Sequence, residues 1–415
     1  MYIRRILNNP VFNNIFWLVS EKIVTLSLIF YSEGLIARSL TKELYGQWIY
    51  SLNLVTLLSS IALIAGAEVA VPALSRNKKI SGELIASVFS VRLIFAIIAY
   101  IGVNIYSLLI INDNSIRSFI SILAFIILLS EPISVIINYY QARVSIKKIA
   151  FFRILSLASR VIVVVISYKY HLNPEFIALS RVVEMLVLAL LLGYLWKAKK
   201  FGFRLNKKIC KVIIARGVYF WPSLVLMYVY LRADRFFVEH YTSFTTLALY
   251  GVAVQLTEQT FVLTKMIIQS VSPIYIFSKV SKNILKRNIL RLIGLILVVN
   301  FVVIIFSYLL LPMIVPFLFG DKYSGAVQFA LCMLPALVFY SIDNVLMQLI
   351  FREKMGGALL IKWGGGVIIM SLIYIIYFQI YRGNDLALIY NINYFIMLLM
   401  TLLLFFIRSK NARHS

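Results

Sequence analysis

The sequence holds few charged residues, and acidic residues are the scarcest of them. Among 415 residues there are 16 Asp and Glu against 41 Lys and Arg, and charged residues make up 14% of the chain. Soluble domains carry about 25% charged and about 45–50% apolar residues. Hydrophobic residues here reach 62%, and the mean hydropathy is +0.92. This composition excludes an ordinary soluble domain and predicts a protein that crosses a membrane several times.

Cysteine and histidine are also rare. Cys210 lies in a basic segment and Cys332 in an apolar one, and the chain has three histidines in all. Neither residue type shows the close spacing of metal ligands or of a redox pair. We therefore predict no metal site and no disulfide framework.

Long apolar runs recur from one end of the chain to the other. A helix needs about 20 residues to cross the hydrocarbon, and longer helices tilt or project beyond it. The runs predict an all-α integral membrane protein with twelve transmembrane helices, at residues 11–37, 47–74, 82–111, 117–140, 150–170, 176–196, 216–239, 244–277, 287–315, 324–350, 357–379 and 386–407.

Basic residues in the predicted loops fall mainly on one side of the membrane. The largest group lies in the basic segment 197–215, midway along the chain. Because Lys and Arg are enriched in cytoplasmic loops, this alternation predicts that the N-terminus and the C-terminus are both cytoplasmic. It also accounts for most of the net charge of +25, so we do not predict a nucleic-acid partner.

Short landmarks recur in the two halves of the chain. Leu-Tyr-Gly occurs at 44–46 and at 249–251, and Pro132 and Pro335 lie in the fourth and tenth predicted spans. Such matches in equivalent spans are typical of a parallel internal repeat. We predict two six-helix lobes, at 1–197 and 216–415, joined by a basic cytoplasmic linker at 198–215.

Four motifs carry a resemblance to a known family. They are ARSLTKELYG at 37–46, ADRFFV at 233–238, LYGVA at 249–253 and PFLFGDKY at 316–323. Together with the order of the spans, they make the chain resemble the polysaccharide-exporter branch of the multidrug/oligosaccharidyl-lipid/polysaccharide (MOP) exporters. Within this branch the chain is most similar to Wzx-type O-antigen flippases.

The resemblance implies a MATE-like fold and a transporter rather than an enzyme. The implied substrate is an undecaprenyl-pyrophosphate-linked oligosaccharide, which a flippase moves across the bilayer of the bacterial inner membrane. An O-antigen polymerase and a chain-length regulator are the implied protein partners. The resemblance implies no organic cofactor.

Ionisable residues inside the predicted spans are the candidate functional groups. A charge at the centre of a spanning helix costs about 2.5–3.5 kcal/mol on insertion scales, so such residues face a bundle interior or a hydrated cavity. We expect a hydrated cavity between the lobes. Arginine suits the oxygens of a pyrophosphate, because its planar donors bind in pairs. The candidate substrate-binding cations are Arg92, Arg160, Arg181, Arg232, Arg235 and Lys265.

The acidic residues in the same spans have two alternative roles. Each carboxylate either binds a proton or sodium ion that drives alternating access, or forms a structural salt bridge with a neighbouring cation. Asp234 is a special case because it lies between Arg232 and Arg235, which share a helix face three residues apart. The candidates are Glu68, Glu131, Glu184, Asp234, Glu258 and Asp343.

The sequence also allows other functions. A lipid II flippase of the same fold often has two additional spans, and a multidrug exporter of organic cations favours an acidic interior. A membrane-embedded polysaccharide polymerase or ligase is expected to have a large outer loop, whereas the outer loops here are short. A purely structural membrane protein leaves the intramembrane charges unexplained.

Overall fold

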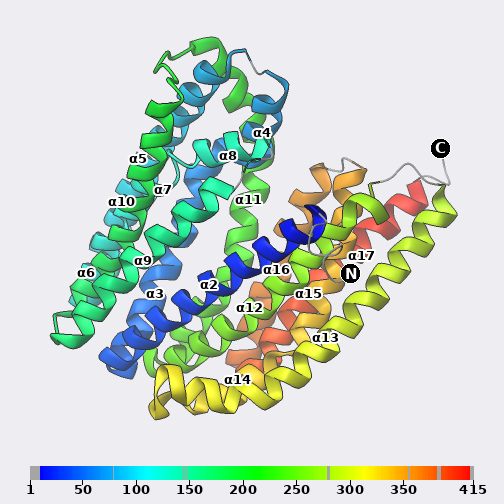
Figure 1. The fold of residues 1–415 in the computed structure, drawn as a ribbon. Coiled ribbons are helices and arrows are strands. Elements are labelled where there is room, and N and C mark those ends of the chain that lie inside the picture. The colour runs from blue at the N-terminus through cyan, green and yellow to red at the C-terminus, as the bar shows by residue number, and fades with distance from the viewer. Residues whose placement is uncertain are drawn as a thin grey trace, which may run out of the picture. The chain divides into compact units, whose positions relative to one another are not determined.

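The computed structural model describes residues 10–77, 79–143, 145, 147–277, 281–353, 356–380 and 385–411. These residues form twelve long helical segments (Figure 1). Seven are continuous α-helices, namely α2 (Pro10–Ser39), α5 (Ser81–Ile110), α9 (Lys147–Lys169), α10 (Pro174–Ala198), α11 (Lys207–Tyr241), α12 (Phe244–Tyr275) and α17 (Leu386–Asn411). The predicted all-helical fold is confirmed.

The other five segments are interrupted or extended by short helical turns. The second consists of α3 (Lys42–Ser59), η1 (Ser60–Ala65) and α4 (Ala67–Arg76), and the fourth of α6 (Asn114–Leu123), α7 (Phe125–Ser130) and α8 (Val135–Ala142). The last three are α13 (Lys282–Phe319) with η2 (Asp321–Tyr323), α14 (Gly325–Met333) with α15 (Pro335–Arg352), and α16 (Gly356–Ile375) with the π-helical turn η3 (Ile376–Ile380).

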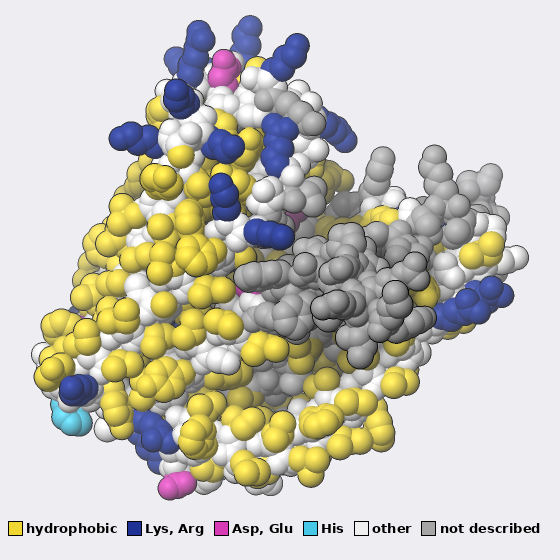
Figure 2. All heavy atoms as spheres, viewed as in Figure 1, with side chains coloured by type: hydrophobic (Ala, Val, Ile, Leu, Met, Phe, Trp, Pro, Cys, Tyr) yellow, Lys and Arg dark blue, Asp and Glu magenta, His cyan; other side chains and the backbone are white. Residues whose placement is uncertain are grey.

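Ten of the twelve segments among the described residues are long and apolar enough to cross a membrane. Figure 2 shows hydrophobic side chains spread over most of the visible described surface. Large apolar side chains such as Met313 and Phe317 are more than 70% exposed. Soluble proteins rarely expose such large contiguous apolar areas, so lipid is the natural surrounding of these helices. The sidedness of the two termini stays a prediction, since residues 1–9 and 412–415 lie outside the described residues.

The seventh helical segment begins earlier than the apolar pattern predicted. Helix α11 starts at Lys207, nine residues before the predicted span, and Asn206 caps its N-terminus. The Asn206 Oδ1 atom accepts hydrogen bonds from the backbone N–H groups of Lys208 and Ile209 at 3.1 and 3.3 Å. Half of the segment that we predicted as a linker is therefore helical. The apolar pattern did not predict this part of the helix, because its lysines interrupt the apolar run. Lysine is nevertheless compatible with a helix.

The two repeated prolines mark breaks in equivalent helices. The fourth segment is interrupted by turns at residues 131–134, around Pro132, and the tenth at the junction of α14 and α15, where Pro335 begins α15. Proline cannot donate the helical hydrogen bond, and its ring clashes with the preceding turn. The repeat read from the sequence thus corresponds to a repeated structural feature.

The chain divides into two compact units. Unit 1 comprises residues 1–41 and 54–221, and unit 2 comprises residues 42–53 and 222–415. Helices α3 and α11 each contribute to both units, and the division of α11 coincides with Pro222. A buried apolar core in unit 1 includes Ile85, Val135 and Leu192, and one in unit 2 includes Ile268, Ile296 and Val345.

The repeated Leu-Tyr-Gly motif marks where α3 and α12 pack against each other within unit 2. A Cβ atom added to Gly46 would lie 1.9 Å from the carbonyl oxygen of Phe244, at the start of α12. A Cβ atom added to Gly251 would lie 2.4 Å from the Cδ1 atom of Ile49, on α3. Each glycine therefore allows the equivalent helix of the other repeat to approach closely.

We expect the two glycines to differ in their tolerance of alanine. Gly46→Ala forces the backbone of α12 away and is expected to cost about 1–3 kcal/mol of folding free energy, as in overpacked cores. Gly251→Ala meets only side-chain atoms of Ile49, most closely the terminal Cδ1 atom, and is expected to cost less. The thermal unfolding midpoints of the two purified variants measure this difference, and equal midpoints would contradict the packing described here.

Candidate functional site

Most of the predicted site residues lie in three buried groups of charged side chains. We name them the Asp234 cluster (Arg232, Asp234, Arg235 and Glu258), the Glu33 cluster (Glu33, Arg160, Arg181 and Glu184) and the Asp343 cluster (Asp343 and Lys362). The first and third belong to unit 2 and the second to unit 1. Each cluster is formed by residues that lie within the predicted spans.

In the Asp234 cluster, Arg235 is held between two carboxylates. Its Nη1 atom donates to Asp234 Oδ1 at 2.8 Å, and its Nη2 atom donates to Glu258 Oε1 at 2.5 Å. The hydroxyl of Tyr250 donates to the other oxygen of Asp234 at 2.7 Å. Both oxygens of Asp234 are thus occupied by protein donors in this structure.

Arg232 differs from Arg235 in both exposure and bonding. The Arg232 side chain is 32% exposed, whereas that of Arg235 is 4% exposed. Arg232 donates to Asn53 Oδ1 at 3.1 Å and lies 4.0 Å from Glu258 Oε2. Glu258 is already bound closely by Arg235, so it neutralises Arg232 only weakly. Arg232 therefore keeps guanidinium donors available for an external anion.

The Glu33 cluster joins three helices of unit 1. Glu33 Oε1, on α2, accepts from Arg160 Nη2 on α9 at 2.5 Å and from Arg181 Nη2 on α10 at 2.8 Å. Glu184 lies 3.8 Å from Arg160 and 3.5 Å from Arg181. Arg160 is fully buried, but the Arg181 side chain is 25% exposed. Arg181 is therefore the accessible cation of this cluster.

The Asp343 cluster is a buried ion pair between α15 and α16. Lys362 Nζ lies 2.7 and 2.8 Å from the two oxygens of Asp343, and Thr401 on α17 donates to Oδ1 at 2.5 Å. Lys362 Nζ also lies 4.6 Å from the centre of the Trp363 ring. All three bonded side chains are almost completely buried. This pair joins three helices and offers no accessible charge.

Sequence reasoning did not find Glu33 and Lys362. Glu33 lies near the end of the first predicted span, and Lys362 follows four apolar residues near the start of the eleventh. Both positions are within the predicted spans. Because an unpaired charge inside a membrane is costly, their position alone could have identified these residues as members of charge clusters. Their partners Arg160 and Asp343 were among the predicted residues.

Arg92 binds backbone and side-chain oxygens of unit 1 where two helical segments are interrupted. Its Nε and Nη2 atoms donate to the carbonyl of Ala65 at 2.9 and 2.5 Å, next to the break between η1 and α4. Other donors reach Ser134 Oγ at 2.6 Å and Asn138 Oδ1 at 2.8 Å, near the break between α7 and α8. Arg92 satisfies acceptors that helix breaks leave without their usual partners.

We expect Arg92→Lys to destabilise unit 1. A guanidinium has several donors in a planar fork and reaches both helix breaks, whereas a single ammonium group cannot bond to both. The unsatisfied buried acceptors are expected to cost about 1–3 kcal/mol. The unfolding midpoint of the purified variant measures this loss. Arg153→Lys, an exposed change on α9, serves as the control, and equal midpoints for the two variants would show that the Arg92 bonds contribute little.

Three predicted residues lie apart from these clusters. Lys265 is exposed on α12, Glu68 is exposed in the first turn of α4, and Glu131 is half-buried at the break in the fourth segment. Within the described part of the chain, none of the three side chains forms an ion pair. The accessible cations among the predicted set are thus Arg181, Arg232 and Lys265.

Residues 35–328 match the family model described as polysaccharide biosynthesis protein. The chain belongs to this family. No curated protein matches the chain.

Solved transporters share the fold of this family member. An inward-facing multidrug resistance MATE family transporter of the MOP superfamily is 16% identical, with a TM-score of 0.72 over 95% of this chain and 99% of that one. The lipid II flippase MurJ, in an inward closed conformation, is 15% identical, with a TM-score of 0.68 over 93% and 86% of the two chains.

A third similar structure is a MOP superfamily transporter from Pyrococcus furiosus whose binding pocket has reverse polarity. It is 12% identical, with a TM-score of 0.60 over 95% of each chain. The predicted MATE-like fold is confirmed by these three structures.

Proposed function

We propose that the chain is a flippase for lipid-linked oligosaccharides. It moves undecaprenyl-pyrophosphate-linked O-antigen repeat units from the cytoplasmic to the periplasmic leaflet of a bacterial inner membrane. The observation that supports this most is the family match over residues 35–328, a polysaccharide biosynthesis family, on a chain with a MOP transporter fold. A protein that moves the lipid carrier of a glycan across the membrane would both take part in polysaccharide biosynthesis and have a transporter fold.

The charge clusters support an anionic substrate. A pyrophosphate that leaves water for the hydrocarbon needs donors that replace its hydration. Arg232 and Arg181 are part-exposed guanidinium groups, and each shares a carboxylate with a more buried arginine that binds it more closely: Arg235 at Glu258, and Arg160 at Glu33. Such a group is fixed in position but not fully neutralised. It can therefore bind phosphate oxygens in pairs, while the lipid tail stays in the bilayer.

An ion gradient is the proposed source of energy, with a proton or a sodium ion as the coupling ion. Four of the six predicted carboxylates, namely Glu184, Asp234, Glu258 and Asp343, form ion pairs with arginine or lysine. Glu68 and Glu131 form none with the described residues. These two are therefore the first carboxylates to test for ion coupling.

A deletion strain tests the proposed function in the cell. We expect surface polysaccharide to disappear while lipid-linked repeat units accumulate, and both effects to reverse when the gene is returned. Normal surface polysaccharide in the deletion strain would refute the proposal. Normal polysaccharide together with increased sensitivity to cationic drugs would instead indicate a multidrug exporter.

A further inference from the structure

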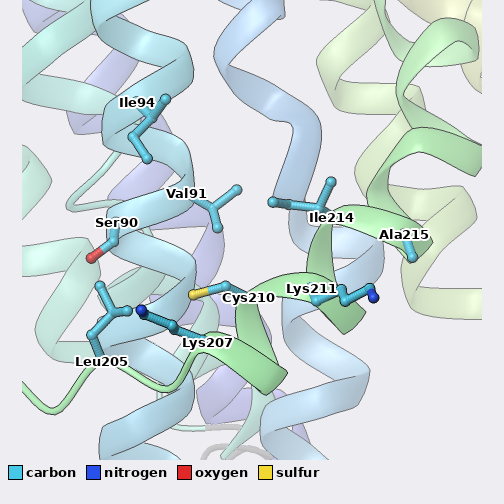
Figure 3. Close-up of a pocket in the computed structure, with 9 residues that line it drawn as sticks. All are labelled: Ser90, Val91, Ile94, Leu205, Lys207, Cys210, Lys211, Ile214 and Ala215. Atoms are coloured by element: carbon cyan, nitrogen blue, oxygen red, sulfur yellow. The ribbon is translucent and has the colours of Figure 1, made fainter.

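An apolar groove in unit 1 lies beside the basic segment and belongs to none of the charge clusters. Its volume is about 540 Å³, which is within the usual range of ligand pockets. It is formed by α5 and by the start of α11 (Figure 3). Its lining residues are Ser90, Val91, Ile94, Leu205, Lys207, Cys210, Lys211, Ile214 and Ala215.

The charged and apolar residues of this groove are separated along α11. Lys207 and Lys211 are four residues apart and share a helix face, and Ile214 and Ala215 continue that face one turn further. Figure 3 shows Cys210 pointing toward α5, with the two lysines on either side. The two ammonium groups thus lie on opposite sides of Cys210, and the aliphatic side chain of Ile214 follows on the next turn of α11.

The aliphatic lining continues along α5 in the direction of the predicted membrane centre. Ile94 is 57% exposed, and Ile98, Ile101 and Ile105 extend its exposed face by successive turns. A hydrocarbon chain that enters the groove can therefore follow α5 without meeting a charged side chain. Asn206 connects the start of α11 to α5, because its side-chain amide donates a hydrogen bond to the Glu83 carboxylate on α5 at 3.0 Å.

Among the described residues, the lysines beside the groove are not paired with an acidic side chain, and the nearby carboxylate of Glu83 is bound by Asn206. No acidic residue occurs between Glu184 and Asp234 in the sequence. Within the described residues, neither Lys207 nor Lys211 forms an ion pair. Lys207 lies in the first turn of α11, where a cation is also unfavourable with the helix macrodipole. These lysines leave a positive potential that an external anion would neutralise.

We propose that this groove binds an anionic phospholipid of the cytoplasmic leaflet, with the phosphodiester at Lys207 and Lys211 and one acyl chain along Ile94 and Ile214. Basic pockets between membrane helices on the cytoplasmic side bind anionic headgroups. Lysine, a compact point charge, suits a phosphodiester with a single negative charge, whereas a pyrophosphate favours the paired donors of arginine. The bound lipid anchors the start of α11 at the membrane surface.

Native mass spectrometry of the purified full-length chain with phosphatidylglycerol and phosphatidylethanolamine tests this proposal. We expect selective retention of phosphatidylglycerol, and about 25-fold weaker binding by the double variant Lys207→Gln/Lys211→Gln. Lys199→Gln/Lys200→Gln removes the same charge from the same basic segment outside the groove and is expected to retain the lipid. Equal retention by the two double variants would overturn the proposal. If undecaprenyl phosphate displaces phosphatidylglycerol from the wild-type chain, the proposal that a phospholipid occupies the groove is wrong.

The wild-type chain gives a second measurement that needs no variant. We expect a small maleimide to alkylate Cys210 at least fivefold more slowly in vesicles that contain phosphatidylglycerol than in vesicles of phosphatidylcholine alone. Cys332, which is exposed in unit 2 and lies outside the groove, provides the control rate in the same molecule. A Cys210 rate that is the same in the two vesicle types, or that changes only in parallel with the Cys332 rate, would overturn the proposal.

Discussion

Lys362→Met is expected to lower the free energy of unfolding by about 3–5 kcal/mol, because it leaves the carboxylate of Asp343 buried without its cation. The two residues are among the most buried charged groups in unit 2, and Lys362 Nζ lies within 2.8 Å of both carboxylate oxygens. Among the described residues, the hydroxyl of Thr401 is the only other donor to Asp343, and a hydroxyl does not neutralise a charge. The unfolding midpoint of the purified variant, in detergent, measures the loss.

The matched control removes both charges together. Asp343→Leu/Lys362→Met replaces the ion pair by apolar side chains, and such replacements are often neutral or stabilising. We expect this double variant to unfold near the wild-type midpoint. If the double variant is as unstable as Lys362→Met, the loss arises from packing rather than from an unpaired charge, and the account of this cluster is wrong.

Arg232→Ala is expected to reduce export of the glycan by about 10- to 100-fold, since it removes charge-assisted hydrogen bonds to the proposed pyrophosphate. Arg232→Lys keeps the charge but loses the paired geometry, so we expect intermediate export. The amount of surface polysaccharide per cell measures the effect, normalised to the amount of each variant in the membrane.

Stability separates this role from a structural one. The Arg232 side chain is part-exposed, and its nearest carboxylate is bound by Arg235. We therefore expect Arg232→Ala to leave the unfolding midpoint almost unchanged. Arg216→Ala, an exposed change nearer the start of the same helix, is the control for the loss of one positive charge. Equal export by Arg216→Ala and Arg232→Ala would remove Arg232 from the proposed site.

The helices could be predicted from the sequence because the bilayer constrains them strongly. A helix must satisfy its own backbone groups in hydrocarbon, so long apolar runs have few alternative structures. Each predicted range overlaps one described helical segment, and the largest difference is at α11, which begins nine residues before the predicted span. The repeated prolines also indicated where helices are interrupted, since Pro132 and Pro335 coincide with helix breaks.

The pairing of the charges could not be predicted in the same way. Glu33 and Arg160 are 127 residues apart, and only the packing of α2 on α9 brings them within 2.5 Å. Periodicity placed Arg232 and Arg235 on one helix face, but it gave no information on Tyr250, Glu258 or Asn53. The contacts of these residues explain why Arg235 is buried and bonded, whereas Arg232 keeps accessible donors.

Translocation by the purified chain in proteoliposomes tests the central claim most directly. The vesicles contain an undecaprenyl-pyrophosphate-linked oligosaccharide in both leaflets, and a membrane-impermeant glycosidase reports how much of the glycan reaches the outer leaflet. With the wild-type chain and an imposed ion gradient, we predict that the glycan of the inner leaflet also becomes accessible, and that Arg232→Ala strongly slows this step. Accessibility no greater than in protein-free vesicles would contradict the proposal that this chain is a flippase for lipid-linked oligosaccharides.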